Sequence, residues 1–558
     1  MVRVIKYLLP LLLCFQFLNY AKLYYFSSDD IKNIPARDVY GILEKIADLH
    51  GISYGRTGQL MQVKTLGKDP YRSNIYINDL PLTNFNSGIT NLSSLSLDRI
   101  DNIIIDDSPV NNSSINIYIY TKKYSMDEPV TEMIYRDAFY NHRNLSMHLG
   151  QKFSENTSFL LYAEMTDYSD HRESSDAFAY PYKKQNYNLH VDFPELLFFK
   201  PSIEFSYLQE NIYDFSVDSV LNDSRAYKTY RWIVNFNSLE SDLIDNKLSF
   251  INSFKHDQFD TDNKNYSIYD QFTYKDSTNI FRLRTHLEFY NYQDLGGESS
   301  FSIEPSYKKN FGTLNTSFFS YVKYSDITEL TYSLSTELTQ DIPWGFEVNS
   351  EHSIYNGSFR VLGNVFDVKF YQNNFYLKKY FDLLDFSGSI YSGIDIIEYL
   401  KNECANSTGY LSSGVIRYSK NKLKFNFLKN FNLNLEYSHR ITSKTLLYDP
   451  NSTIISSLNF SDKYLNDNFQ FSATIMHKYS DYYISEDNRE IINNLGINLR
   501  AKILDVEIFF GIDNLMKNKY DINNNTYILN EHYVYQTIEG YDMQIFDEIW
   551  GVRWIIRY

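Results

Sequence analysis

The sequence predicts a transmembrane antiparallel β-barrel of about 20 to 22 strands, with a small N-terminal α/β domain inside its lumen. Three observations indicate this fold class. The chain ends on a strand that alternates between apolar and polar residues, and the same alternation recurs through most of its 558 residues. Aromatic residues also make up 17% of the chain, with 51 Tyr and 40 Phe. Tyrosine suits the girdles where a barrel meets lipid headgroups, because its ring is apolar and its tip is polar.

The end of the chain carries the clearest alternation. Every second residue there is large and apolar, namely Trp550, Val552, Trp554, Ile556 and Tyr558, and the residues between them are mostly polar or small. This pattern is typical of a strand with one face against an apolar medium and the other against water. Because the last strand of a barrel must pair with the first, we expect these five residues to be the barrel assembly signal. Their predicted partners are the barrel assembly machinery and outer-membrane lipid.

From about residue 130 onward the sequence repeats one unit, an alternating strand followed by a polar connection. Ile203, Phe205 and Tyr207 alternate with polar residues, and so does the apolar series from Leu495 to Ile503. Each strand is expected to span roughly ten residues, which crosses a bilayer at the tilt of a barrel. The longest connections are predicted at residues 168–184, 401–408, 446–466 and 521–542.

The first 21 residues are predicted to be a signal peptide, with an uncleaved anchor helix as the alternative. Arg3 and Lys6 precede a short apolar stretch that ends near Leu18, and Ala21 is the small residue at the expected cleavage site. Residues 22–125 follow as an α/β domain, with a helix predicted over residues 38–49 and several β-branched strands. Residues 126–558 form the predicted barrel. A barrel of about 20 strands needs a plug, and we expect the α/β domain to be that plug.

Composition excludes several classes of protein. The net charge of −16, from 69 acidic and 53 basic residues, argues against a nucleic-acid partner. Beyond residue 20 no apolar run is long enough for a membrane-spanning helix. The chain has only two cysteines, Cys14 and Cys404, so neither a disulfide framework nor a metal–thiolate site is expected.

No catalytic constellation stands out, so we predict that the protein is not an enzyme and has no cofactor or metal. His142 and His148 are six residues apart and therefore lie on one face of a strand. A metal-binding pair is conceivable there, but we favour two barrel-wall histidines that face the lumen.

Five segments resemble motifs of one known family, the TonB-dependent receptors of the Gram-negative outer membrane. Residues 27–43, 75–82, 97–105 and 115–122 resemble, in order, the opening segment, the first strand and turn, the second strand and the closing strand of the family's plug. Residues 511–520, with the sequence GIDNLMKNKY, resemble the motif that precedes the family's last strand. The resemblance covers the whole plug and the last part of the barrel.

The resemblance implies a bacterial outer-membrane importer of a scarce small-molecule nutrient, such as a metal chelate, cobalamin or an oligosaccharide. Family members are driven by the inner-membrane partner TonB, which grips a short box ahead of the plug. Here only residues 22–26 separate Ala21 from the opening segment, and no box is recognisable. The alternative is therefore an uncoupled barrel, either a passive pore or a structural or adhesive surface protein.

The resemblance also places one plug loop toward the outside of the barrel, where family members contact ligand. Its residues are Lys68, Asp69, Tyr71 and Arg72. A solvated loop without a specific contact is the alternative, and it is the one that we favour.

Overall fold

The computed structural model describes two stretches of the chain. The first is residues 23–123, without 37, 54–60, 67, 69–72, 83–91, 93–94 and 107–114. The second is residues 128–557, without 139–141, 155–156, 169–181, 197, 214–223, 239–242, 258–261, 293–295, 343–345, 362–363, 384–385, 403–413, 429, 443–449, 467, 484–488, 514, 516–518, 523–525, 531–532, 537–540 and 545–546. The predicted signal peptide and Tyr558 lie outside the described residues.

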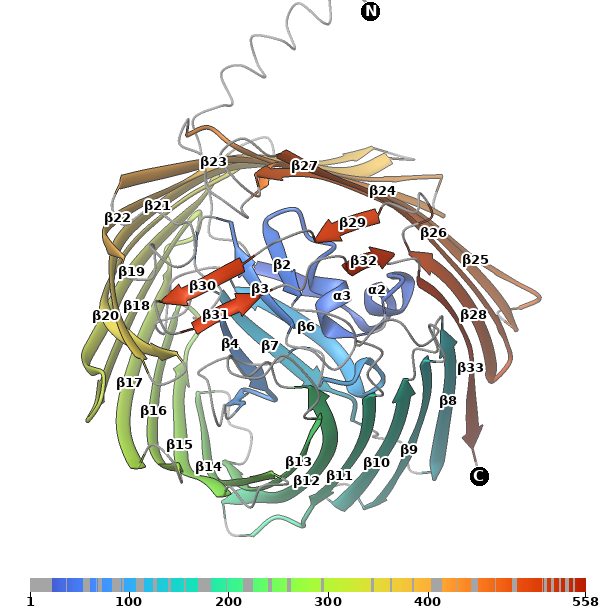
Figure 1. The fold of residues 1–558 in the computed structure, drawn as a ribbon, viewed down its shortest axis with the longest axis horizontal. Helices are drawn as coiled ribbons and strands as arrows, with labels where there is room; N and C mark the ends of the chain where they lie inside the picture. The colour runs from blue at the N-terminus through green and yellow to red at the C-terminus, as the bar shows by residue number, and fades with distance from the viewer. Residues whose placement is uncertain are drawn as a thin grey trace, which may run out of the picture.

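The second stretch forms a closed antiparallel barrel of 22 strands, which confirms the predicted fold class. Each strand pairs with its neighbours in sequence, and β33 pairs with β8 to close the cylinder (Figure 1). The strands are β8 Val130–Ala138, β9 His142–Ser154, β10 Thr157–Tyr168, β11 Tyr182–Asp192, β12 Phe199–Tyr213, β13 Ser224–Ser238, β14 Ile244–Asp257, β15 Asp262–Lys275, β16 Asn279–Tyr292, β17 Gly296–Asn310, β18 Leu314–Ser325, β19 Glu329–Ile342, β20 Phe346–Val361, β21 Asn364–Leu383, β22 Phe386–Asn402, β23 Gly414–Phe427, β24 Phe431–Arg440, β25 Pro450–Tyr464, β26 Phe469–Tyr483, β27 Arg489–Ile503, β28 Val506–Asp513 and β33 Asp547–Arg557.

Alternation along the strands separates an apolar outer face from a polar inner face. On β33, Trp550, Val552 and Trp554 are exposed on the outside, while Gly551 is buried on the lumen side. This agrees with the alternation predicted for the end of the chain. A closed barrel with such an exterior satisfies its backbone internally and presents its apolar side chains to lipid. Among the described residues, no helix is long and apolar enough to cross a membrane.

Two predictions about the barrel are wrong in detail. Strand lengths are not uniformly near ten, since they run from 8 residues in β28 to 20 in β21. The connection predicted at residues 446–466 is instead mostly β25, Pro450–Tyr464, because Ile454 and its neighbours pair in register with β26. Polar residues of this strand such as Thr453 and Ser457 are buried on its lumen face.

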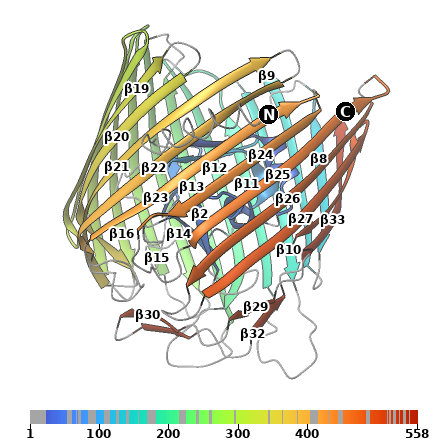
Figure 2. The ribbon, with the colours of Figure 1, turned by 90° about the horizontal axis from the view of Figure 1, so that it is seen from above.

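The two ends of the barrel differ in their connections. At the end where the chain finishes, neighbouring strands are joined by short turns, as between Ile503 and Val506. At the opposite end lies the long connection between β28 and β33. It carries two small ribbons, β29 Lys519–Ile522 with β32 Tyr541–Gln544, and β30 Thr526–Asn530 with β31 Tyr533–Gln536 (Figure 2). Outer-membrane barrels have short periplasmic turns and longer external loops, so this second end is assigned to the outside.

The first stretch forms the plug, which lies inside the ring of barrel strands (Figure 1). Its five-stranded sheet has the order β1-β6-β7-β4-β5. The strands are β1 Leu23–Phe26, β4 Ser73–Ile77, β5 Leu80–Pro81, β6 Ile100–Asp106 and β7 Ile115–Thr121, and β2 Leu49–Ser53 pairs separately with β3 Met61–Thr65. Ile103, Ile105, Ile115 and Ile117 are fully buried where the sheet packs on the helices.

The helix predicted over residues 38–49 is shorter than predicted, and a second helix precedes it. Helix α3 spans Val39–Leu43 instead of continuing to residue 49, and α2 spans Ser28–Asn33, where no helix was predicted. The predicted apolar positions are still buried, including Ile46, but Leu49 already begins β2. The barrel explains the early end, because the backbone of Ala47 bonds to two side chains of β24 rather than to a further helical turn.

Both helices begin at a side-chain cap. Ser27 and Asp30 form a reciprocal capping box on α2, and Asp38 accepts from the backbone of Gly41 on α3. We expect Ser27→Ala to cost about 1 kcal/mol of local stability, because it removes the acceptor for a backbone N–H that has no partner within the helix. Hydrogen exchange of the Asp30 amide should rise correspondingly, and unchanged protection there would contradict the expectation.

Candidate functional site

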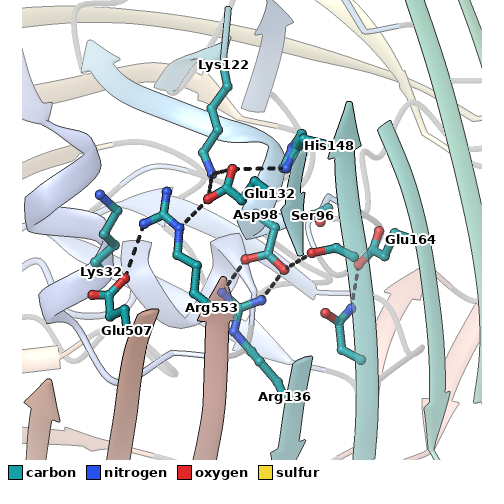
Figure 3. Close-up of polar contacts among 12 residues, drawn as sticks. Lys32, Ser96, Asp98, Lys122, Glu132, Arg136, His148, Glu164, Glu507 and Arg553 are labelled. Carbon is teal, nitrogen blue, oxygen red and sulfur yellow. Dashed lines mark hydrogen bonds and ion pairs between the residues drawn. The ribbon is translucent and has the colours of Figure 1, made fainter. Parts of the chain in front are cut away.

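The most highly charged contact between plug and barrel lies where the barrel closes. We call it the seam cluster. It consists of Asp98 and Lys122 from the plug, Glu132 and Arg136 from β8, His148 from β9, Glu507 from β28 and Arg553 from β33, all labelled in Figure 3, together with Arg500 from β27. Asp98 lies in the 3-10 helix η4, Leu97–Arg99, and Lys122 directly follows β7.

Glu132 is the centre of the first half of this cluster, and only 1% of it is exposed. The Nζ of Lys122 lies 3.2 Å from its carboxylate, and Nδ1 of His148 lies 3.2 Å from it as well. Arg553 pairs with Glu132 from the other side of the closing strand pair. One buried carboxylate therefore joins the plug, the first two strands and the last strand of the barrel.

The same arginine extends the network along the wall. Nη1 of Arg553 lies 3.3 Å from Glu507, and Nε of Arg500 donates to Glu507 at 2.7 Å. Arg500 also donates to the backbone carbonyl of Lys32 at the end of α2, at 2.6 Å. The network thus holds both the N-terminal helix and the C-terminal end of the plug.

Asp98 is the centre of the second half. It pairs with Arg136 and accepts a hydrogen bond from Ser146 at 2.7 Å. Burial alone would raise the pKa of Asp98, but the charge of Arg136 and its hydrogen bond outweigh burial and hold that pKa below its usual value. The carboxylate form of Asp98 is therefore the one that the folded protein stabilises.

Further polar contacts hold the plug at other points of the wall. They are Lys45 with Asp513 and Glu44 with Lys478, each at 2.7 Å, Arg99 with Glu204 at 2.5 Å, Lys247 with the carbonyl of Asn78 at 2.7 Å, and Arg231 with the carbonyl of Pro81 at 2.8 Å. These contacts attach the plug to β12, β13, β14, β26 and β28.

A cavity of about 50 Å³ lies beside the seam cluster, between α2 and the wall, and its lining includes Pro35, Asp98 and Phe509. A space of this size holds a few water molecules, and a nutrient does not fit in it. Within the described residues, no group of three or more His, Cys, Asp or Glu side chains could hold a metal ion.

The histidines expected on the lumen side are there. His142 and His148 are both buried on the inner face of β9, with Asn144 and Ser146 between them on the same face. His148 contributes to the seam cluster through Glu132.

The predicted ligand-facing loop of the plug is described only at Lys68, which is 1% exposed. Asp69, Tyr71 and Arg72 lie outside the described residues. Contact with a ligand at this loop stays a prediction.

Sequence reasoning did not single out the seam cluster as a site. One signal for it was present, since Glu132 and Arg136 are four residues apart on β8 and therefore point to the same face. Two opposite charges on the lumen face of the first strand indicate partners inside the barrel. Nothing in the sequence identifies those partners as Lys122 and Asp98.

Lys122 gives a pH-dependent prediction. Burial lowers its pKa to about 8, against the opposing effect of Glu132. Between this value and the unfolded value of about 10.4, the unfolded chain binds more protons than the folded chain, so stability contributed by Lys122 rises with pH. We therefore expect the difference in melting temperature, natural protein minus Lys122→Met, to increase from pH 8 to pH 10. A difference that stays constant or falls would contradict this.

The structure was compared with solved structures. The siderophore receptor PirA of Acinetobacter baumannii superposes with a TM-score of 0.71 at 9% identity, covering 96% of this chain and 98% of that one. A variant of the ferric enterobactin receptor PfeA of Pseudomonas aeruginosa gives 0.73 at 10% identity, with coverage of 96% and 98%. The FrpB iron transporter of Neisseria meningitidis gives 0.70 at 9% identity, with coverage of 96% and 99%.

This chain has the fold of these receptors. The likeness extends over nearly the full length of each protein, and it confirms the plugged-barrel architecture that the sequence motifs implied. A comparison of the sequence with protein-family models finds no match, and a comparison with curated proteins finds none either.

Proposed function

We propose that this protein is an outer-membrane transporter of the TonB-dependent-receptor type, which imports a scarce nutrient through its plugged barrel. The observation that carries the proposal is the plug itself, a folded domain that lies inside a closed 22-strand barrel and is attached to the wall by side-chain ion pairs. A plug that is attached in this way can be displaced without breaking a strand pair of the barrel, as import requires. No covalent step is involved.

Among the candidate nutrients, we place a ferric chelate ahead of cobalamin and oligosaccharides. The support is the names of the structural neighbours, a siderophore receptor, a ferric enterobactin receptor and an iron transporter. In the proposed mechanism the nutrient is captured at the outer end and the plug is then displaced by a TonB partner. The charges of the seam cluster are solvated as water enters the lumen.

The test is uptake in cells that lack their own receptors and express the full chain. Radiolabelled ferric enterobactin, cobalamin and maltohexaose are each supplied with and without a protonophore. We expect the chain to raise uptake of the ferric chelate over empty vector, and the protonophore to abolish the increase. Uptake that the protonophore does not reduce would contradict energised import. Increased uptake of cobalamin or maltohexaose instead of ferric enterobactin would correct the nutrient class.

A second candidate, an uncoupled pore or structural surface barrel, has one observation in its favour. Several connections at the outer end are very short, since β8 ends at Ala138 before β9 begins at His142, and β20 ends at Val361 before β21 begins at Asn364. Short loops leave little external surface for capturing a ligand. A chain that gives no uptake of any probe, but a steady conductance, would favour this candidate.

A further inference from the structure

The strand pairs that lead up to the closure of the barrel are short. Strand β27 pairs with β28 through seven residues, β28 with β33 through eight, and β33 with β8 through nine. By comparison, β12 and β13 pair through 15 residues, and β20 and β21 through 16. The nine residues of the closing seam, the β33–β8 pair, match those of β8–β9, β11–β12 and β24–β25. Because ladder hydrogen bonds scale with the number of paired residues, the weakest ladders are the two that precede the seam, β27–β28 and β28–β33.

Among the described residues, two contacts that involve charged side chains cross this seam on the lumen side. The first is the ion pair between Arg553 of β33 and Glu132 of β8. The second joins Phe509 of β28 to Arg136 of β8, across Gly551 of β33. The ring of Phe509 lies against the side-chain-free Gly551, and the guanidinium of Arg136 sits 5.5 Å from the centre of that ring.

The β8 member of each crossing contact is held by the plug. Asp98 pairs with Arg136, which lies directly opposite Gly551 in the strand register, and Lys122 pairs with Glu132. Ile134 and Ile549 fill the apolar space beside these contacts. The plug thus touches the barrel on the same side chains that bridge its first and last strands.

We propose that the docked plug is a clamp on the closing seam of its own barrel. Asp98 fixes the Arg136 guanidinium over Phe509, and this contact joins β8 to β28 across β33. Without Asp98, the half-buried guanidinium of Arg136 lacks its carboxylate and turns toward water instead. Of the two charged contacts only the Arg553–Glu132 pair then remains, beside the nine-residue ladder and the packing of Ile134 with Ile549. Plug docking and barrel closure are therefore coupled, which goes beyond any role of the plug in import.

The test uses the full chain with Cys404→Ser and a disulfide across the seam, from Ala138→Cys and Ile549→Cys. These two positions are register partners, are buried on the lumen face and carry no charge. Thermal unfolding is followed by the shift of the folded band in gel electrophoresis, with the disulfide oxidised or reduced. We expect Asp98→Asn to lower the midpoint by on the order of 5 °C in the reduced protein, and oxidation to remove most of this loss.

The matched control is Glu44→Gln, which breaks a plug–barrel ion pair with Lys478 on β26, away from the seam. We expect the fall in midpoint caused by Glu44→Gln to remain when the disulfide is oxidised. The proposal is overturned if oxidation leaves the fall in midpoint caused by Asp98→Asn unchanged, or if oxidation restores the midpoints of both variants equally. It is also overturned if Asp98→Asn does not lower the midpoint. Should Asp98→Asn give no folded band, Ser146→Ala takes its place, because it removes only the 2.7 Å bond to Asp98.

Discussion

Gly551→Val is expected to reduce the yield of folded barrel several-fold, the largest effect of any single glycine substitution that we predict. A β-carbon at this position would overlap the backbone carbonyl oxygen of Tyr135 on β8 and the ring of Phe509 on β28. The ring could turn, but the carbonyl belongs to the closing strand pair and cannot move without disturbing its register. Overpacking of this kind typically costs about 1–3 kcal/mol or more. The measurement is the folded fraction in heat-modified gel electrophoresis.

Gly297→Val is the control for this experiment. Gly297 lies on β17, and an added β-carbon there would meet only the carbonyl oxygen of Tyr290, at an ordinary 3.6 Å. We expect this variant to fold like the natural protein. Equal yields for the two variants would show that the seam is not packed as described.

Glu132→Gln is also expected to have a large effect. The substitution keeps the size of the side chain but removes the charge that Lys122 and Arg553 share in a buried site. Leaving one member of a buried pair without its partner typically costs about 3–5 kcal/mol. The midpoint of urea unfolding should fall accordingly, because Glu132 is only 1% exposed and its cationic partners would lose their carboxylate in a buried site.

Asp137→Asn is the matched comparison on the same strand. Asp137 pairs with Arg143 at 3.9 Å, and the arginine side chain is 64% exposed. Exposed pairs contribute about 0–1 kcal/mol, so the midpoint should hardly change. A loss as large as that of Glu132→Gln would show that the strand, rather than the seam cluster, is sensitive to substitution.

The wall of the barrel could be predicted from the sequence because the side-chain faces of a strand follow a period of two. Trp550, Val552 and Trp554 were expected to face an apolar medium, and each is more than a third exposed on the outer face. The same argument found His142 and His148 on the inner face. Local alternation is enough for this inference, since each strand of a barrel is wetted on one side only.

The seam cluster could not be predicted in the same way. Glu132 and Arg553 are 421 residues apart, and they meet only because the last strand closes on the first. The plug contacts add a second long-range condition, because Asp98 and Lys122 must dock in one orientation. The early end of α3 has the same origin, since the residues after Leu43 follow contacts with β24 rather than their own helical periodicity.

The measurement that most directly tests the central claim is single-channel conductance of the intact protein in a planar bilayer. The account predicts a closed lumen with almost no steady conductance, and large openings only when urea on the periplasmic side loosens the plug. Steady large conductance from the intact protein without urea would contradict it, because a barrel of 22 strands that conducts freely is not closed by its plug.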